Sequence, residues 1–102
     1  MKRVEGQGIA TYYVYILRCA DDSFYVGSAQ NLEARVKAHN DGRGAAHTFK
    51  HHPVRLVYSE MFRSESVALA RERQLKRWTS AKKQALIEGD LKQLKSLSKR
   101  RT

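Results

Sequence analysis

Four residues whose side chains suit acid–base and phosphate chemistry lie close together in the sequence: Tyr15, Tyr25, Arg35 and His39, separated by ten, ten and four residues. When a phosphodiester is cleaved, negative charge builds up on phosphorus, and the planar, always-charged guanidinium of Arg35 can neutralise it. A tyrosine has a pKa of about 10 and needs a nearby cation to act as a base at neutral pH. His39, with an ordinary pKa of about 6.5, needs no such help. The pattern indicates a site rather than a plain scaffold, and it leaves Tyr15 and His39 as alternative general bases.

Two short strands joined by a tight turn must position the two tyrosines. β-Branched and aromatic residues without helical periodicity predict a strand over residues 13 to about 19, followed by turn chemistry at 21–23 and a second strand at 24–26. Because side chains alternate along a strand, Tyr15 shares a face with its second neighbours on either side. Gly27 is predicted to end the second strand and to let another backbone or a phosphate approach closely.

A helix over residues 32–40 must position the arginine and the histidine. Asn31 is a good N-cap, and apolar residues recur one turn apart behind it. Arg35 and His39 are also one turn apart, so they are expected to share a neighbouring face. A polar loop over residues 41–53 is expected to follow.

Three histidines in this loop, His47, His51 and His52, invite comparison with a metal site. The single cysteine, Cys19, is remote in sequence, and the histidines match no recognised zinc-ligand spacing. The sequence therefore argues against a zinc site and favours a loop near the substrate. Cys19 lies in an apolar run and is predicted to be a buried free thiol.

The second half of the chain predicts a strand over residues 54–62, helices over 65–78 and 80–89, and a short helix beginning near 91. The apolar stripe of the 65–78 helix comprises Val67, Ala68, Leu75 and Trp78. Arg71 falls within that stripe, where a charge needs a partner or a ligand. The order strand, strand, helix, strand, helix, helix predicts an α+β fold: a small three-stranded, mostly antiparallel sheet with helices packed on it.

The composition predicts a single basic domain that binds a polyanion. The chain has 102 residues, with 20 Lys and Arg against 10 Asp and Glu, a formal charge of +10 and a pI near 10.1. A field of this sign attracts nucleic acid, although the same charge can also serve solubility alone. No signal-peptide pattern and no apolar run of membrane-spanning length is seen, so we expect a cytoplasmic location and no membrane contact.

The same motifs resemble the GIY-YIG nuclease family, and above all its small stand-alone bacterial members. The resemblance covers about residues 12–85 and rests on Tyr13-Val14-Tyr15, Tyr25-Val26-Gly27, Asn31-Leu32 with Arg35 and His39, and a later helix with Glu72 and Lys76. The chain departs from the eponymous motif at the first glycine, which is Tyr13, and at both isoleucines, which are valine.

This resemblance implies hydrolysis of a phosphodiester by an activated water, assisted by one divalent metal, Mg²⁺ or alternatively Mn²⁺. Tyr15 then corresponds to the proposed general base or its relay. Tyr25 is expected to hydrogen-bond the water or the scissile phosphate. Arg35 corresponds to the family arginine and Glu72 to the helix carboxylate that binds the metal. Lys76 stands where that helix often carries a basic residue.

A phosphate-contacting surface is expected from the remaining basic and small residues. It comprises Gly27, Lys37, His47, Lys76, Arg77, Lys82 and Lys83, extended by the basic tail at 99–101. The expected partner is nucleic acid, with DNA preferred over RNA. Since no second module is evident, specificity has to come from the nuclease domain itself or from a partner protein.

The prediction for the whole chain is a flexible lead-in over residues 1–11, a GIY-YIG nuclease domain over 12–89, and a short helix with a basic tail over 90–102. The predicted activity is metal-dependent endonuclease cleavage of DNA, single-stranded or structured DNA included, as in repair or processing. The alternatives are a nucleic-acid-binding module without catalysis and a basic ribosome- or nucleoid-associated protein. Cleavage that disappears with a chelator would exclude both.

Overall fold

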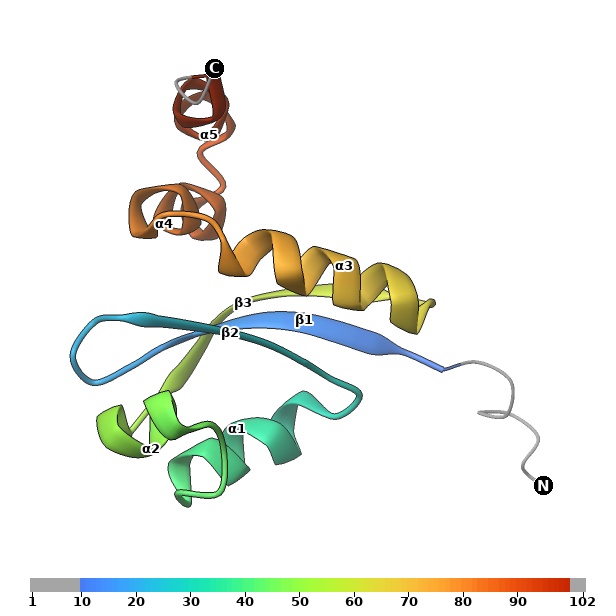
Figure 1. Ribbon diagram of the computed structural model, residues 1–102, viewed down its shortest axis with the longest axis vertical. Coiled ribbons are helices and arrows are strands. Elements are labelled where there is room, and N and C mark those ends of the chain that lie inside the picture. The colour runs from blue at the N-terminus through green and yellow to red at the C-terminus, as the bar shows by residue number, and fades with distance from the viewer. Residues whose placement is uncertain (1–9, 100–102) are drawn as a thin grey trace.

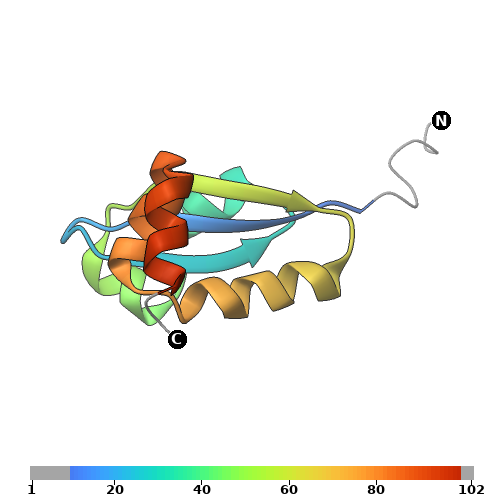
Figure 2. The same cartoon turned by 90° about the horizontal axis from the view of Figure 1, so that it is seen from above.

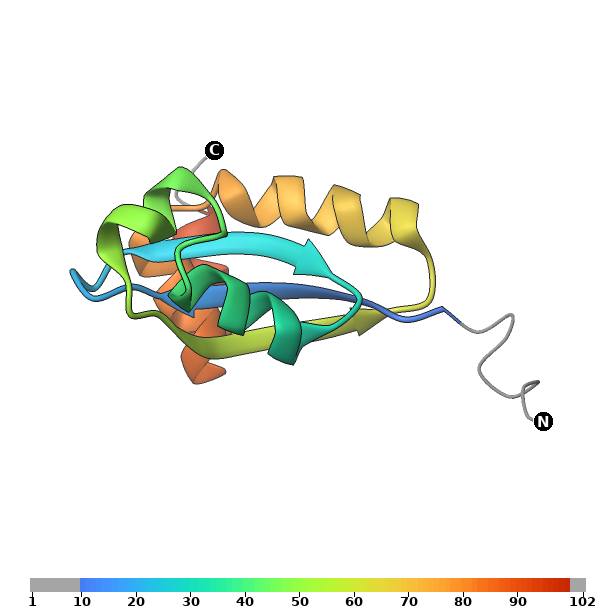
Figure 3. The same ribbon diagram turned by 90° about the horizontal axis from the view of Figure 1, so that it is seen from below.

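A computed structural model describes residues 10–99 of the chain, with the side chains of 10–98. Its elements are β1 (Tyr12–Arg18), β2 (Phe24–Ala29), α1 (Leu32–Asn40), α2 (Ala46–His51), β3 (Arg55–Phe62), α3 (Glu65–Lys76), α4 (Ser80–Glu88) and α5 (Leu91–Lys99). The sheet is antiparallel with the order β2-β1-β3. Helix α3 covers one face, and α1 and α2 cover the other (Figures 1 and 3). The predicted α+β fold is confirmed. Most of the predicted lead-in and the end of the basic tail lie outside the described residues.

The central strand β1 is buried on both faces, which explains its continuous apolar sequence. Val14 and Ile16 are fully buried in the cluster that α3 covers. Tyr15 and Leu17 are buried on the opposite face, against α1. The predicted alternation therefore holds, and it places the ring of Tyr15 between the sheet and α1.

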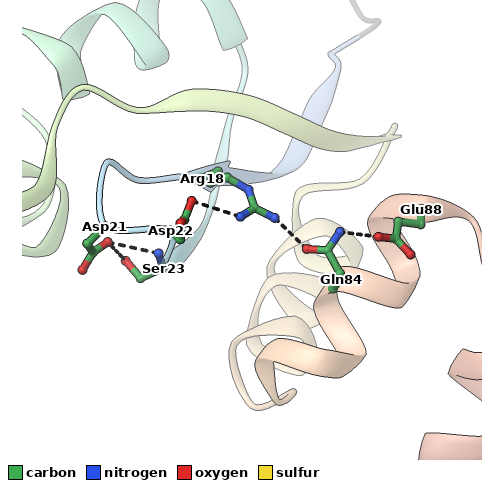
Figure 4. Close-up of polar contacts among 6 residues, drawn as sticks. All are labelled: Arg18, Asp21, Asp22, Ser23, Gln84 and Glu88. Atoms are coloured by element: carbon green, nitrogen blue, oxygen red, sulfur yellow. Dashed lines mark hydrogen bonds and ion pairs between the residues drawn. The ribbon is translucent and has the colours of Figure 1, made fainter.

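The β1–β2 turn is held by its own polar side chains. Asp22 takes a positive φ of 70°, and the Asp21 carboxylate accepts hydrogen bonds from the Ser23 amide at 3.0 Å and the Ser23 hydroxyl at 2.6 Å. Arg18 beside this turn donates to Gln84 of α4 at 2.6 Å (Figure 4). The hairpin turn is thereby tied to the C-terminal helices.

Helix α1 begins as predicted and is fixed at its end by one side chain. The Asn31 side chain accepts a hydrogen bond from the Ala34 amide at 3.0 Å. At the other end, the side-chain Nδ2 of Asn40 donates to the Val54 carbonyl at 3.0 Å. The side-chain Oδ1 of Asn40 accepts from the Val54 backbone amide at 2.6 Å. This pair of bonds holds the segment before β3 against α1.

The segment predicted as a loop over residues 41–53 contains the short helix α2. Its N-cap, Ala45, makes no side-chain capping bond, so the usual sequence signal for a helix start is missing. Thr48 is the buried residue of α2.

Helix α3 differs from its prediction in length and in its apolar face. The Ser64 side chain caps its start, and it ends at Lys76 rather than at residue 78. Val67 was expected in the core and is 51% exposed. The charge of Arg71 has the partner that its position demands, because its guanidinium donates to both Glu60 carboxylate oxygens at 2.8 Å.

The C-terminal helices extend from one end of α3. Gly89 closes α4 in the left-handed conformation with φ 72°, as its sequence position predicts. Asp90 then caps α5, accepting from the Gln93 amide at 3.0 Å. Helix α5 packs on α4 and projects away from the sheet (Figure 1). Viewed from above, α4 and α5 lie in front of the sheet (Figure 2). Over residues 10–99, none of the helices combines the length and apolarity that a bilayer crossing requires.

We predict that Asn40→Ala lowers the free energy of unfolding by about 2 kcal/mol, since it leaves two groups of the buried Val54 backbone unpaired. Denaturant unfolding monitored by circular dichroism measures the change. The control is Gln93→Ala, an exposed polar residue of α5, for which we expect less than about 0.5 kcal/mol. Equal effects of the two variants would contradict this role of Asn40.

Candidate active site

The candidate site forms at the edge strand β2, where the ring of Tyr15 crosses Gly27. The two residues are paired in the β1–β2 register. A Cβ atom on Gly27 would lie 2.6 Å from Cζ of Tyr15 and collide with its hydroxyl. The strand was predicted to end at Gly27, but it continues to Ala29. The glycine makes room for the tyrosine ring, which corrects the expectation that a phosphate or another backbone approaches there.

A chain of hydrogen bonds leads from Tyr15 into α2. The Tyr15 hydroxyl lies 3.2 Å from Nε2 of His39, and Nδ1 of His39 lies 2.7 Å from the Thr48 hydroxyl. Thr48 donates its single hydroxyl proton to the Ala45 carbonyl at 2.9 Å. The Thr48 oxygen must therefore accept from Nδ1–H of His39. In the neutral imidazole, Nε2 is then the acceptor for the Tyr15 hydroxyl proton.

The imidazole of His39 is enclosed and kept neutral by its surroundings. It is 2% exposed, and a Cβ atom on Gly44 would collide with its ring. Burial, and then the nearby charge of Arg35, lower the pKa of His39 below 6.5. A neutral His39 can accept a proton at neutral pH.

Tyr25 and His47 extend this cluster of rings toward the hairpin turn. The Tyr25 ring centroid lies 5.2 Å from that of His39 and 6.5 Å from that of His47, with the Tyr25 and His47 rings inclined by only 16°. The ring of Tyr25 therefore lies between the buried imidazole of His39 and the exposed imidazole of His47.

Arg35 from α1 and Glu72 from α3 reach β2 from opposite faces of the sheet. Arg35 donates to the Ser28 carbonyl at 3.3 Å, while the Ser28 hydroxyl donates to the Glu72 carboxylate at 2.8 Å. Burial has the largest effect on the pKa of Tyr15 and raises it above the usual value. The nearby Arg35 lowers this pKa, and the charge of Glu72 raises it. The groups expected to do chemistry therefore influence one another across the β2 edge. A cavity of about 200 Å³, lined in part by Ser28 and Arg35, opens beside them.

The donor set at Glu72 fits a hard divalent cation. Its carboxylate is 15% exposed and has the Ser28 hydroxyl on one oxygen and the Lys76 ammonium, at 3.0 Å, on the other. A carboxylate and a hydroxyl are oxygen ligands of the kind that Mg²⁺ takes, together with waters and substrate oxygens.

The residues expected to contact phosphate differ in exposure and in their partners. Lys37 is exposed and pairs with Asp41 at 3.0 Å. Arg77 is exposed, and burial lowers the pKa of Lys83. Lys82 is only 7% exposed, with its ammonium 4.4 Å from the Trp78 ring centroid. The ammonium of Lys82 thus makes a cation–π contact with Trp78, and its place on a phosphate-contacting surface stays a prediction.

Three residues of the site were missed in the sequence: Ser28, Gly44 and Thr48. Their roles depend on contacts with Glu72 and His39 across the fold, which no local pattern encodes. The only local signal is that Gly44 and Thr48 flank a helix start.

A family model, described as the GIY-YIG catalytic domain, matches residues 11–85. A UPF0213 protein from Staphylococcus haemolyticus is 46% identical over 80 residues, which is 78% of this chain and 98% of that protein. A UPF0213 protein from Staphylococcus aureus is also 46% identical, over 76% of this chain and 95% of its own length.

Two structures solved by solution NMR are also similar. A UPF0213 protein from Bacillus halodurans has 37% identity and a TM-score of 0.51, over 76% of this chain and 83% of its own. A protein from E. faecalis has 35% identity and a TM-score of 0.53, over 79% and 88% respectively.

We predict that nitrogen-detected NMR of the imidazoles finds His39 as the Nδ1–H tautomer with a pKa below 6.5. As the pH falls through about 6.5, the unfolded chain takes up this proton first, so the stability of the fold declines on the acid side. Thr48→Val removes the acceptor of Nδ1–H and should abolish the tautomer preference. An Nε2–H tautomer would contradict the inferred hydrogen-bond direction, and a pKa above 6.5 would contradict the effect of burial and Arg35 on the imidazole.

Proposed function

This chain belongs to the GIY-YIG family, and we propose on that premise that it is a divalent-metal-dependent endonuclease that hydrolyses phosphodiester bonds in DNA. The observation that carries the proposal is the convergence at the β2 edge of a tyrosine with an oriented hydroxyl, a guanidinium and a carboxylate: Tyr15, Arg35 and Glu72. The fold alone would not suffice, since one fold can serve many functions.

Tyr15 and His39, which the sequence left as alternatives, act in series in this proposal. The Tyr15 hydroxyl proton points to Nε2 of His39, so the lone pairs of its oxygen remain for an attacking water. As the water attacks phosphorus, its proton passes to Tyr15 while the tyrosine proton passes to His39. The resulting imidazolium keeps its Nδ1–H bond to Thr48. Tyr15 thus stays neutral, in accord with a pKa that burial raises.

Arg35 and Glu72 would together stabilise the negative charge of the phosphate. Arg35, anchored on the Ser28 carbonyl, would hold the phosphate oxygens and neutralise charge that grows in the transition state. Glu72, supported by the Ser28 hydroxyl, would hold Mg²⁺ or Mn²⁺. A divalent ion bound there supplies Lewis-acid stabilisation of the phosphate and the leaving oxygen. Lys76, which pairs with Glu72 at 3.0 Å, would be free to contact the phosphate if Glu72 held a cation.

Nucleic acid is the substrate class of the family, and DNA in the bacterial cytoplasm is the substrate we propose. The formal charge of +10 supports affinity for a polyanion, and cations such as Lys37 and Arg77 are exposed. Such contacts carry no sequence information, so selection of a single-stranded or structured site in DNA repair or processing would come from the domain's shape or from a partner protein.

One observation favours the alternative of a nucleic-acid-binding module without catalysis. The Glu72 carboxylate is already paired with Lys76 at 3.0 Å, as an ordinary structural carboxylate would be. The two functions predict different responses to metal, because a binding module needs no divalent ion.

We predict that the protein cuts labelled DNA with Mg²⁺ or Mn²⁺ and that a chelator abolishes the cutting. Glu72→Gln and Arg35→Ala should each lower single-turnover cleavage about 100-fold or more, because each removes charge stabilisation realised in the transition state. Denaturing gels with single-stranded, duplex and branched DNA, and matched RNA, measure the rate and the substrate class together.

The matched control is Glu33→Gln, a neutralised carboxylate on the exposed surface of α1, which should cut at the wild-type rate. Binding of DNA should persist in Glu72→Gln. Salt-sensitive binding without cleavage of any of these substrates would favour the binding-module alternative instead.

A further inference from the structure

A second cluster of metal-ligating side chains lies at the other end of the ring cluster, where the β1–β2 turn meets α2. One ligand atom each from Cys19, Asp21 and His47 lies within 4.8 Å of the other two. His51 joins them, since its Nδ1 lies 3.3 Å from the Asp21 carboxylate and its ring centroid lies 4.7 Å from that of His47. We propose that these four residues bind a zinc ion, separately from the proposed cleavage chemistry and from Glu72.

The backbone holds the four ligands in place before any ion binds. The Cys19 amide donates to the Ser23 carbonyl at 2.8 Å, which closes the turn that carries Asp21. The Ala20 amide donates to the His51 carbonyl at 2.8 Å, which fixes the end of α2 to that turn. A site supported in this way loses little chain entropy when it closes on a metal.

Two of the ligands have a spacing that is typical of zinc. His47 and His51 are one turn apart on α2, so both imidazoles can face the same ion. The sequence argument against zinc rested on a cysteine remote in sequence and on the absence of a recognised ligand spacing. In the fold, residues 46–51 form a helix that places His47 and His51 one turn apart, and Cys19 lies close to His47.

The donor set selects the metal. A thiolate, two imidazoles and one carboxylate make a four-coordinate set of the kind that Zn²⁺ takes, whereas Mg²⁺ prefers oxygen alone. Zinc bonds of 2.0–2.3 Å place tetrahedral ligand atoms about 3.5 Å apart. The ligand atoms of Cys19, Asp21 and His47, which lie within 4.8 Å of one another, would therefore approach by about 1 Å, and the His51 imidazole beside Asp21 would turn toward the ion to complete the set.

A role for the cysteine as a nucleophile fits the surroundings less well. Burial raises the pKa of the Cys19 thiol, and the charge of Asp21 acts in the same direction. The Ser23 hydroxyl bridges Asp21 at 2.6 Å and His47 at 2.8 Å. Zinc would take the place of that bridge and displace the thiol proton of Cys19 to solvent.

Zinc at this position would link α2, through His47 and His51, to the β1–β2 turn, through Cys19 and Asp21. His47 stacks on Tyr25, and the next residue, Thr48, holds the ring of His39. The ion would thereby stiffen the support of the candidate active site without touching the substrate.

The test is a Co²⁺ titration of the untagged protein in the presence of excess Mg²⁺. We expect a thiolate-to-cobalt charge-transfer band that saturates at one ion per chain and disappears on addition of Zn²⁺. Cys19→Ser should abolish the band, and His47→Gln, at an exposed position, should weaken Co²⁺ affinity at least about tenfold. Zn²⁺ at about a hundred times its Kd should raise the wild-type Tm on the order of 10 °C.

His52→Gln is the matched control, since this neighbouring histidine bonds to the Phe49 carbonyl instead of the cluster. It should bind Co²⁺ like the wild type. The absence of a band in the wild type, or a band that survives Cys19→Ser or vanishes in His52→Gln, would overturn the assignment. These readouts are spectroscopic and thermal, so they remain informative whether or not the protein cuts DNA.

Discussion

A buried tyrosine hydroxyl must find a hydrogen-bond partner, and in this small domain the hydroxyl of Tyr15 finds it in His39. Several unusual choices of residue follow from that requirement. Gly27 is needed so that the tyrosine ring can cross the edge strand, and Gly44 is needed so that the chain can pass the imidazole. Thr48 is needed to fix the imidazole tautomer. The strand, helix and short helix that carry these residues form the framework of the candidate site.

The same arrangement separates the charged side chains of Arg35 and Glu72 from the neutral pair of Tyr15 and His39. Arg35 and Glu72 stand on opposite faces of the sheet and meet at β2 through one residue, Ser28. The proposed relay of Tyr15 and His39 lies in the interior, where burial disfavours the charged form of both groups. A phosphate at the edge would thus meet cations first, while the base behind it remains neutral and able to take a proton.

The sequence could predict what local physics determines. The cap at Asn31 and the alternation along β1 are as predicted, and the family motifs include Tyr15, Arg35 and Glu72, which meet at β2. It could not predict contacts between distant segments. Lys82 belongs to a run of cations that looks solvated, yet its ammonium lies on Trp78. Likewise, Cys19 approaches His47 only because a turn and a helix that lacks a side-chain cap pack together.

The central claim is that His39 receives the proton that Tyr15 relays, and a pH–rate profile tests it most directly. The measurement is single-turnover DNA cleavage at saturating Mg²⁺ across pH 5 to 10 for the wild type and His39→Gln, with folding checked at each pH. We expect the wild-type rate to fall on the acid side with an apparent pKa below 6.5, as His39 becomes protonated. His39→Gln should lose that acid limb and about 100-fold in rate. A rate that keeps rising toward pH 10 and is indifferent to His39 would instead mean that Tyr15 acts alone as a phenolate, and would contradict the account.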